Sequence, residues 1–520
     1  MTASRVLLAA LWLALAGPAA AQTLVVGTAT QTTSIDPHFQ LAFTNIAPLR
    51  HVFDPLFAQD ARQQLHPALA VEWTAVAPTT WRIKLRAGVR FHDGTPFTAD
   101  DVAFTLARAP NVPNSPASYA LYTRAIEAVT VVDALTVEIR TRAPHPTLPM
   151  ELSTIGIVSR RAAAQATTAD FNAGRAAIGT GPFRFEAWTP GERLVLARNE
   201  DYWGARPDWA RVEFRRIPNE SARVVALLAG DADIVEAVPP NAVARIRERA
   251  DMALASTTAN RVILLAVNHA REPIAQARSA SGEALPDNPL RDLRVRQAIS
   301  AAIDRPGLVE RVMLGEAAPA GQVLPATYAS AHPGLAPDAF DIERARRLLA
   351  QAGHALGLTI TLIAPNDRYV NDEQVAQAIS QMLARAGIRV QLEALPSAIV
   401  LQRGNRREFG LMMWGISSET GETLASLHSL LGSEQSAGGR GNGNRGYYAD
   451  AELDALIAQA SAAMDPDART ALGRAAAERA LGALGFIPLY FPTNTWAMRR
   501  ALTYAPRADG YTLAMDVRAR

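Results

Sequence analysis

The chain has 520 residues, 49% of them hydrophobic and 20% charged, so it is long enough for two or three globular domains and is neither disordered nor fibrous. Its formal charge is +2, and no basic run interleaved with aromatic residues occurs, which argues against a nucleic-acid partner. The sequence contains no cysteine, which excludes disulfides and thiolate-bound metals.

Residues 1–21 have the pattern of a secretory signal peptide. Arg5 supplies the positive charge, Val6 to Ala16 form the apolar stretch, and small residues precede a cleavage site before Gln22. The apolar stretch is too short for a good membrane span. Because no cysteine is available for lipid attachment, the sequence predicts a periplasmic protein without a lipid anchor. We expect it to be a monomer.

Residues 81–108 predict a strand, a turn and a capped helix. Apolar and basic residues alternate over 81–86, as in a half-buried strand, and the alternation resumes over 89–91. Thr98 begins a helix, with Asp101 three residues later as a capping-box partner. Earlier in the chain, residues 23–28 predict a strand and residues 46–57 an apolar helix.

The pair His92-Asp93 lies in the turn before this helix and has two interpretations. A metal-dependent hydrolase would use it together with the distant His38 or His66. However, the chain has no H-E-x-x-H cluster and no G-x-S-x-G motif. The pattern therefore favours a structural role, in which His92 and Asp93 close the turn through backbone hydrogen bonds.

A glycine-rich loop, Gly179-Thr180-Gly181, leads into a hairpin predicted over 184–199. No Lys-Ser/Thr pair follows and a strand comes next, so neither nucleotide-binding fingerprint fits. We predict that the glycines permit a sharp chain crossing between two lobes. A second hairpin is predicted over 130–140.

The remaining pattern predicts a mixed α/β sheet. A helix over 220–229 is followed by a strand over 233–235, and the apolar run 262–267 predicts a strand buried on both faces. The part after Asn268 is rich in helices, and Asn371 is the expected cap of one of them. The helices are predicted at 293–303, 307–314, 342–352, 372–386, 450–464 and 466–484, and the strands at 358–364, 388–392, 411–414 and 486–491.

Several strings resemble the signature of the extracytoplasmic solute-binding proteins of the peptide/nickel family (family 5), which serve ATP-driven importers. They follow in the family's order along nearly the whole chain: S-I-D-P-H at 34–38, K-L-R-A-G-V-R-F-H-D-G-T-P-F-T-A-D-D-V at 84–102, G-T-G-P-F at 179–183 and D-L-R-V-R-Q-A-I at 292–299.

This resemblance implies a two-lobed α/β periplasmic-binding-protein fold with a hinge of two crossing strands. Lobe I spans 22–267 and includes an extra subdomain at about 49–178, lobe II spans 268–485, and residues 486–520 return to lobe I. The implied function is that of the substrate-binding component of an ABC transporter, which clamps a peptide or peptide-like small metabolite and hands it to the permease and its ATPase. No catalysis and no cofactor are implied; a ligand-loaded sensor or chaperone on the same fold is the other alternative.

The resemblance also implies where ligand binds. The segment Trp414-Gly415 resembles the family's W-G motif, which lines the pocket. Peptide-binding relatives have an aspartate two residues later for the ligand's amino group, whereas this chain has Ser417. Either Glu419 or Glu422 replaces that carboxylate, or both are solvated loop residues.

Further ligand contacts are expected in other loops. Arg368 either holds a carboxylate of the ligand or pairs with Asp367 at the surface. Tyr369 is expected to stack on the ligand, and Tyr447 either covers the ligand or packs against other protein side chains. The complete set of predicted ligand-binding residues is Ser34, Asn268, Asn366, Arg368, Tyr369, Trp414, Gly415, Ser417, Ser418, Glu419 and Tyr447.

Overall fold

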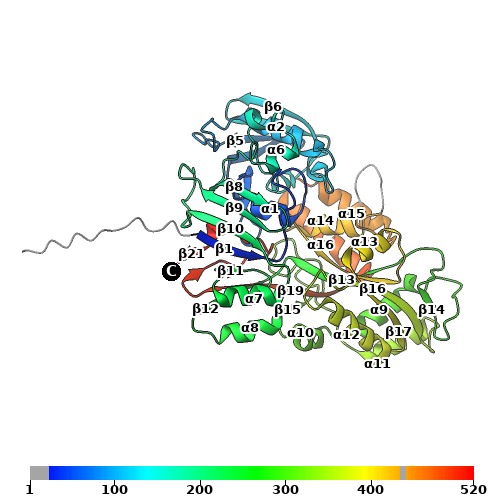
Figure 1. Ribbon diagram of the computed structural model, residues 1–520. Helices are drawn as coiled ribbons and strands as arrows, with labels where there is room; N and C mark the ends of the chain where they lie inside the picture. Colours follow the sequence, from blue (N-terminus) through cyan, green and yellow to red (C-terminus); the bar gives the residue numbers. More distant parts are fainter. Residues whose placement is uncertain (1–22, 434–440) are drawn as a thin grey trace, which may run out of the picture.

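The computed structural model describes residues 23–433 and 441–520, and Figure 1 shows their arrangement. The predicted signal peptide, residues 1–21, lies outside the described residues. The structure has the predicted mixed α/β architecture, with a large curled sheet that runs through both lobes and a smaller sheet beside it. Within the described part of the chain, no helix is both long and apolar enough to cross a bilayer.

The large sheet contains 13 strands and has one continuous path of neighbours. Pairs β1–β10, β1–β11, β16–β17 and β16–β18 are parallel, and the others are antiparallel. The path is β14 (Ala277–Ser279), β16 (Leu358–Pro365), β18 (Leu411–Ser417), β13 (Arg261–Val267), β19 (Phe486–Arg499), β11 (Ile234–Val235), β1 (Thr23–Thr28), β10 (Arg211–Arg216), β9 (Arg193–Arg198) and β8 (Phe183–Thr189). Strands β12 (Met252–Thr258) and β15 (Ala317–Pro319) pair with β19, and β17 (Ile388–Leu395) pairs with β16.

Strand β19 connects the two halves of this sheet. Its first half pairs with β13, for example Ile487 opposite Leu265, and its second half pairs with β12, for example Asn494 opposite Thr257. Only Ala259 and Asn260 separate β12 from β13, so the chain crosses between the halves twice at the same place. Strand β13 is buried on both faces between β18 and β19, so this crossing lies at the centre of the sheet with a lobe on either side.

Lobe II packs helices against strands β13, β16, β17 and β18. One hydrophobic core joins Leu265 and Leu362 of the sheet to Ile299, Leu349 and Ile379 of three helices. A second core lies on the other face, beneath α14, α15 and α16. The helices are α9 (Leu293–Ala301), α10 (Arg305–Arg311), α11 (Ile342–Gln351), α12 (Asp372–Arg385), α13 (Ser397–Asn405), α14 (Thr423–Leu430), α15 (Ala451–Ala462) and α16 (Pro466–Gly482).

Lobe I contains the other half of the large sheet, the helices α7 (Glu220–Ala229) and α8 (Pro240–Arg247), and a separate four-stranded sheet at the top of Figure 1. That sheet has its own core, which includes Ile83, Val102 and Ile139. It consists of β4 (Ala70–Ala77), β5 (Thr80–Leu85), β7 (Thr136–Thr141) and β6 (Ile126–Asp133), with α2 (Ala99–Arg108) against it.

The strand, turn and helix predicted over 81–108 are largely confirmed. Thr98 and Asp101 form the expected capping box at the start of α2. Residues 89–91 are not a strand, because Arg90 forms only an isolated bridge to Pro96. The hairpins predicted over 130–140 and 184–199 are present as β6–β7 and β8–β9.

Three further local predictions differ from the structure in whole or in part. The helix expected over 46–57 is α1 (Phe43–Leu49), which ends soon after Pro48. Asn371 occupies the predicted N-cap position of α12, but its side chain does not cap the helix: the residue adopts a left-handed conformation and donates its side-chain amide to Val312 O, 2.9 Å away. The glycine loop does make a close crossing, but the crossing is inside lobe I: a Cβ at Gly179 would lie 1.9 Å from Val52 O.

Candidate functional site

A cavity of about 1010 Å³, including its open mouth, lies where the chain crosses between the lobes. Thr30, Phe43 and Glu236 line it from lobe I, and Arg368 and Tyr369 line it from lobe II. Residues of the crossing strands form the floor, and they include Arg261, Ile263, Tyr490 and Asn494. A mostly apolar cleft with a few polar groups between two lobes is a typical small-molecule site.

The turn between β16 and α12 fixes Arg368 and Tyr369. The buried carboxylate of Asp372 accepts the backbone N–H groups of both residues at 3.0 Å, which closes the turn. The Tyr369 hydroxyl accepts Gly415 N–H at 2.8 Å and the Arg368 Nε–H at 2.8 Å. The Arg368 guanidinium lies over the Trp414 ring, 4.5 Å from its centroid. Four predicted residues are therefore in contact with each other: Arg368, Tyr369, Trp414 and Gly415. The first two line the cavity.

Of the alternatives for Arg368, the structure excludes the pairing with Asp367. Asp367 accepts the backbone N–H of Ser397 at 2.8 Å, at the start of α13. No ion pair joins it to Arg368 in the described part of the chain. The guanidinium instead faces the cavity from its place on Trp414.

Arg261, at the first position of β13, lines the same cavity and was not predicted. Its Nε–H donates to Ser417 Oγ at 3.0 Å, across the β13–β18 pair. Its guanidinium carbon lies 5.9 Å from the Tyr369 ring and 6.0 Å from the Phe43 ring. Burial lowers the pKa of Arg261; the charge of Arg368 adds to this effect, and Tyr369 and Glu419 oppose it.

The acids of the cavity are already bonded to the protein. Glu236 accepts Ala29 N–H at 3.0 Å and the Thr512 hydroxyl at 2.8 Å, and burial raises its pKa. Asp509 is paired with Arg507 at 2.6 Å. Among the residues that line the cavity, the charges left for a ligand are therefore positive.

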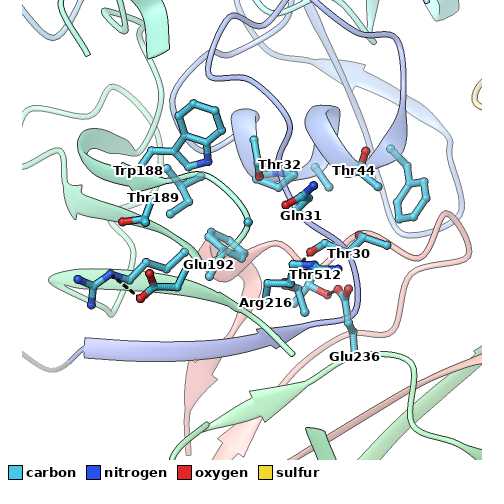
Figure 2. A pocket seen from close by; sticks show the side chains of 18 of the residues that line it. Thr30, Gln31, Thr32, Thr44, Trp188, Thr189, Glu192, Arg216, Glu236 and Thr512 are labelled. Atoms are coloured by element: carbon cyan, nitrogen blue, oxygen red, sulfur yellow. Dashed lines mark hydrogen bonds and ion pairs between the residues drawn. The ribbon is translucent and has the colours of Figure 1, made fainter. Parts of the chain in front are cut away.

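A smaller pocket of about 550 Å³, including its open mouth, adjoins the cavity on the lobe I side, since Thr30, Phe43, Glu236 and Gly510 line both. In Figure 2, Trp188 and Thr189 lie across this side pocket from Gln31 and Thr44. Its lining is rich in hydroxyl groups, from Thr28, Thr30, Thr32, Thr44, Thr189 and Thr512. The side pocket offers space for a polar extension of a ligand held in the cavity.

The loop after β18 joins the lobes instead of lining the cavity. Ser418 O accepts the side-chain amides of Gln63, at 2.9 Å, and Asn260, at 2.8 Å. The Glu419 carboxylate accepts the Tyr511 hydroxyl at 2.8 Å, and burial raises its pKa. Glu419 is thus not a solvated residue. Like Glu422, it is absent from the cavity wall.

The other predicted ligand-binding residues lie outside the cavity wall. The Ser34 hydroxyl donates to Asn172 Oδ1 at 2.8 Å and is fully buried. The Asn268 amide donates to Phe409 O at 2.8 Å, in the turn after β13. Asn366 is exposed, and Tyr447 is 47% exposed under the guanidinium of Arg407.

The three histidines considered for a metal site, His38, His66 and His92, are bonded within the protein. His92 accepts Gly179 N–H at Nδ1 and donates from Nε2 to Gly181 O at 3.0 Å, and burial lowers its pKa to about 4. His38 is bonded to Arg108 and Gly156 O, and burial likewise lowers its pKa to about 4. His66 pairs with Asp60 at the surface. The described residues contain no group of three or more acidic or histidine side chains placed to hold a metal, so the hydrolase alternative has no support.

Two lobes, a double chain crossing and an open cavity at that crossing define a two-lobed solute-binding protein. A family model described as bacterial extracellular solute-binding proteins, family 5, matches residues 64–438. The chain belongs to this family, as its sequence motifs predicted.

Curated relatives agree with this assignment over nearly the whole chain. The glutathione-binding protein GsiB of Escherichia coli (strain K12) is 27% identical over 496 residues, which cover 93% of this chain and 92% of that protein. Among solved structures, HbpA2 from Haemophilus parasuis superposes with a TM-score of 0.81 at 22% identity, over 96% of this chain and 100% of that one. DppA from Helicobacter pylori, in complex with the peptide STSA, gives 0.78 at 22% identity, over 96% and 98%.

Sequence reasoning missed Arg261, Tyr490 and the lobe I residues of the cavity. Arg261 directly precedes the apolar run 262–267, and this was a detectable signal. Charged residues are seldom buried unless they have a partner, so a cation at the start of a buried strand indicates a site. The positions of Phe43 and Glu236 had no comparable signal, since they depend on how two distant loops meet.

Proposed function

We propose that this protein captures a peptide-like small molecule in the interlobe cavity and presents it, in the closed form, to an ABC permease and its ATPase. The observation that carries the proposal is the cavity itself, because its walls come from both lobes and from the crossing between them. A ligand that contacts both lobes binds the closed state better and shifts the population toward it. The ligand leaves the site chemically unchanged, so the protein is not an enzyme.

The proposed ligand binds through Arg368, Tyr369, Trp414 and Gly415, as the W-G motif implies. Arg368, held on the Trp414 ring, suits a carboxylate of the ligand. The predicted lobe boundaries, 22–267, 268–485 and 486–520, are part of the proposal. The separate hydrophobic cores on either side of the crossing support them.

Glutathione and short peptides are the first compounds to test, because GsiB relatives and the peptide-bound DppA carry these names. The side pocket gives a ligand longer than a dipeptide room to extend into lobe I. Ser417 offers no carboxylate for a free amino group, so we expect the amine to contribute little to affinity.

The test is to identify what the protein retains when it is purified. We expect mass spectrometry after gentle denaturation to release a small peptide-like compound, and that compound to raise the melting temperature when added back. A screen of peptides and glutathione by thermal melting provides the same answer if the purified protein is empty. If no compound of these classes is retained or raises the melting temperature, the proposal fails.

We also propose export to the periplasm through the predicted signal peptide. Expression of the full chain in a Gram-negative host is expected to give a periplasmic protein whose first residue is Gln22. N-terminal sequencing of the periplasmic fraction checks this. Retention of the apolar stretch Val6 to Ala16 in the mature protein would contradict it.

A further inference from the structure

Arg261 is a second cation of the cavity, and most of its hydrogen-bonding capacity is unused. A guanidinium has five N–H donors. Only the Nε–H of Arg261 has a protein acceptor, Ser417 Oγ at 3.0 Å, in the described part of the chain. No aspartate or glutamate of that part lies within ion-pair distance of it. The two terminal nitrogens therefore face the cavity without a partner.

Arg368, in the lobe II wall of the cavity, is in the same situation. Its Nε–H donates to the Tyr369 hydroxyl, and its terminal nitrogens have no acceptor among the described residues. Both guanidinium carbons lie against the Tyr369 ring, at 5.5 Å for Arg368 and 5.9 Å for Arg261. Two unpaired cations placed around one ring repel each other, which an anion between or beside them would relieve.

The remaining polar groups of the wall support the same conclusion. Asp509 is paired with Arg507, and in the described part of the chain neither Glu236 nor Asp509 forms an ion pair with Arg261 or Arg368. The acid whose charge acts on Arg261 is Glu419, which lies outside the cavity wall and is bonded to Tyr511. Tyr490 is 1% exposed, and its buried hydroxyl has no hydrogen-bond partner among the described residues. An orphaned buried hydroxyl is costly unless a ligand satisfies it.

We infer that Arg261 forms a second anion site in the cavity, and that the ligand carries two acidic groups, one for each arginine. The inference rests on the proposed function, because it concerns the ligand of the same cavity. Ser417 is then a positioning residue, whose hydroxyl holds the Arg261 guanidinium toward the cavity. The ligand class is a dicarboxylate, such as a short peptide with an acidic side chain.

Two dipeptides of nearly the same shape, Ala-Glu and Ala-Gln, test the inference by calorimetry. They differ only in the side-chain carboxylate. We expect the wild type to bind Ala-Glu about tenfold or more tightly than Ala-Gln, which corresponds to one charge-assisted pair of hydrogen bonds. Arg261→Gln should lose this preference, with Ala-Glu affinity falling to about that of Ala-Gln.

Two further variants keep the result interpretable. Arg368→Gln changes an exposed side chain and should weaken both dipeptides without unfolding the protein. Arg389→Gln removes an exposed guanidinium on β17, away from the cavity, and should change neither affinity. Equal affinity of the wild type for the two dipeptides, a preference that survives Arg261→Gln, or no binding of Ala-Glu at millimolar concentration would each overturn the inference. A neutral compound retained by the purified protein would still leave the proposed function standing.

Discussion

At the scale of single residues, burial keeps His92 and His38 neutral, and each ring joins distant segments of the backbone through hydrogen bonds. The His92 ring spans the gap between the turn before α2 and the glycine loop, where it accepts one backbone N–H and donates to one backbone carbonyl. Only the neutral ring can do both, since the charged ring has two donors and no acceptor. The lowered pKa of about 4 preserves that form at neutral pH.

We expect His92→Ala to lower the free energy of unfolding by about 1–3 kcal/mol at pH 7.5, because it leaves partly buried backbone groups unpaired. Ligand affinity should not change, since His92 is remote from the cavity wall. Chemical denaturation and calorimetry measure the two quantities. His66→Ala, at an exposed histidine, is the matched control and should have little effect. A loss of affinity in His92→Ala would argue for a functional role.

The lowered pKa of His92 predicts how the stability difference between wild type and His92→Ala changes with pH. The folded-state pKa of His92, about 4, is below its ordinary value of 6.5, so the unfolded chain binds the proton first as the pH falls. The stability from neutral His92 is therefore complete above pH 6.5 and is lost progressively down to about pH 4. Between pH 7.5 and 5, the difference between wild type and His92→Ala should shrink by at most about 2 kcal/mol. A constant difference would contradict this.

Trp414 has two roles, and only one of them was visible in the sequence. Its ring supports Arg368, but it is only 9% exposed and packs against Ile363, Val400 and Phe409. Trp414→Ala would thus leave a core cavity that costs about 3–5 kcal/mol. Trp414→Phe is the better test: we expect a severalfold loss of affinity, from a weaker cation–π contact worth roughly 0.5–2 kcal/mol, in a protein that still folds. Unchanged affinity by calorimetry would remove Trp414 from the site.

At the scale of elements, local chemistry made the capped helix α2 predictable. From β5 to α2, the alternating pattern predicts the strand, the turn residues its end, and the capping residues the start of the helix. Asn371 shows the limit of this reasoning, because the residue type suits a cap but the loop geometry takes its side chain to Val312 O. Strand β19 was expected to end near Phe491, yet it continues to Arg499 because it pairs with β12, a partner distant in the sequence.

The glycine loop offers an element-level prediction. The carbonyl oxygen of Val52 occupies the place that a Cβ at position 179 would take, so only glycine fits there. Gly179→Ala should therefore force the two segments apart and destabilise the protein by more than about 3 kcal/mol, or prevent folding. Gly473→Ala is the control: it lies in α16 with no atom near the added methyl, and should be neutral or stabilising by about 0.5–1 kcal/mol. Similar melting temperatures for the two variants would contradict the close approach.

At the scale of the whole molecule, the sequence motifs led to the family and to the two-lobed architecture, and the comparisons confirm both. The cavity was harder to predict. Arg368 and Tyr369 follow one strand, and a local motif marks the nearby Trp414. The lobe I wall, with Phe43 and Glu236, depends on how segments separated by hundreds of residues in the chain come together, which no local pattern encodes.

Gln63 is a buried side chain at the contact between the lobes, beside the hydrogen bonds that Gln59 and Tyr511 donate to Glu419. Its amide donates to Ser418 O of lobe II, and its Oε1 accepts both Asn260 Nδ2, at 2.8 Å, and the Tyr328 hydroxyl, at 2.8 Å. Its backbone is left-handed, with a φ of 59°, which an L side chain adopts only when its surroundings require it. Gln63 thus ties lobe I, the crossing and lobe II together in the state shown in Figure 1.

Because apparent affinity scales with the fraction of closed molecules, weakening this contact should weaken ligand binding without touching the cavity. We expect Gln63→Ala to shift the open–closed ratio by about tenfold, for a net loss of roughly 1.4 kcal/mol of hydrogen bonding. Small-angle scattering should then show a larger radius of gyration, and calorimetry a weaker affinity for whatever ligand the protein retains. Gln64→Ala, at the exposed neighbouring position, should resemble the wild type in both measurements. If Gln63→Ala also keeps the wild-type dimensions and affinity, the hydrogen bonds of Gln63 have no part in closure.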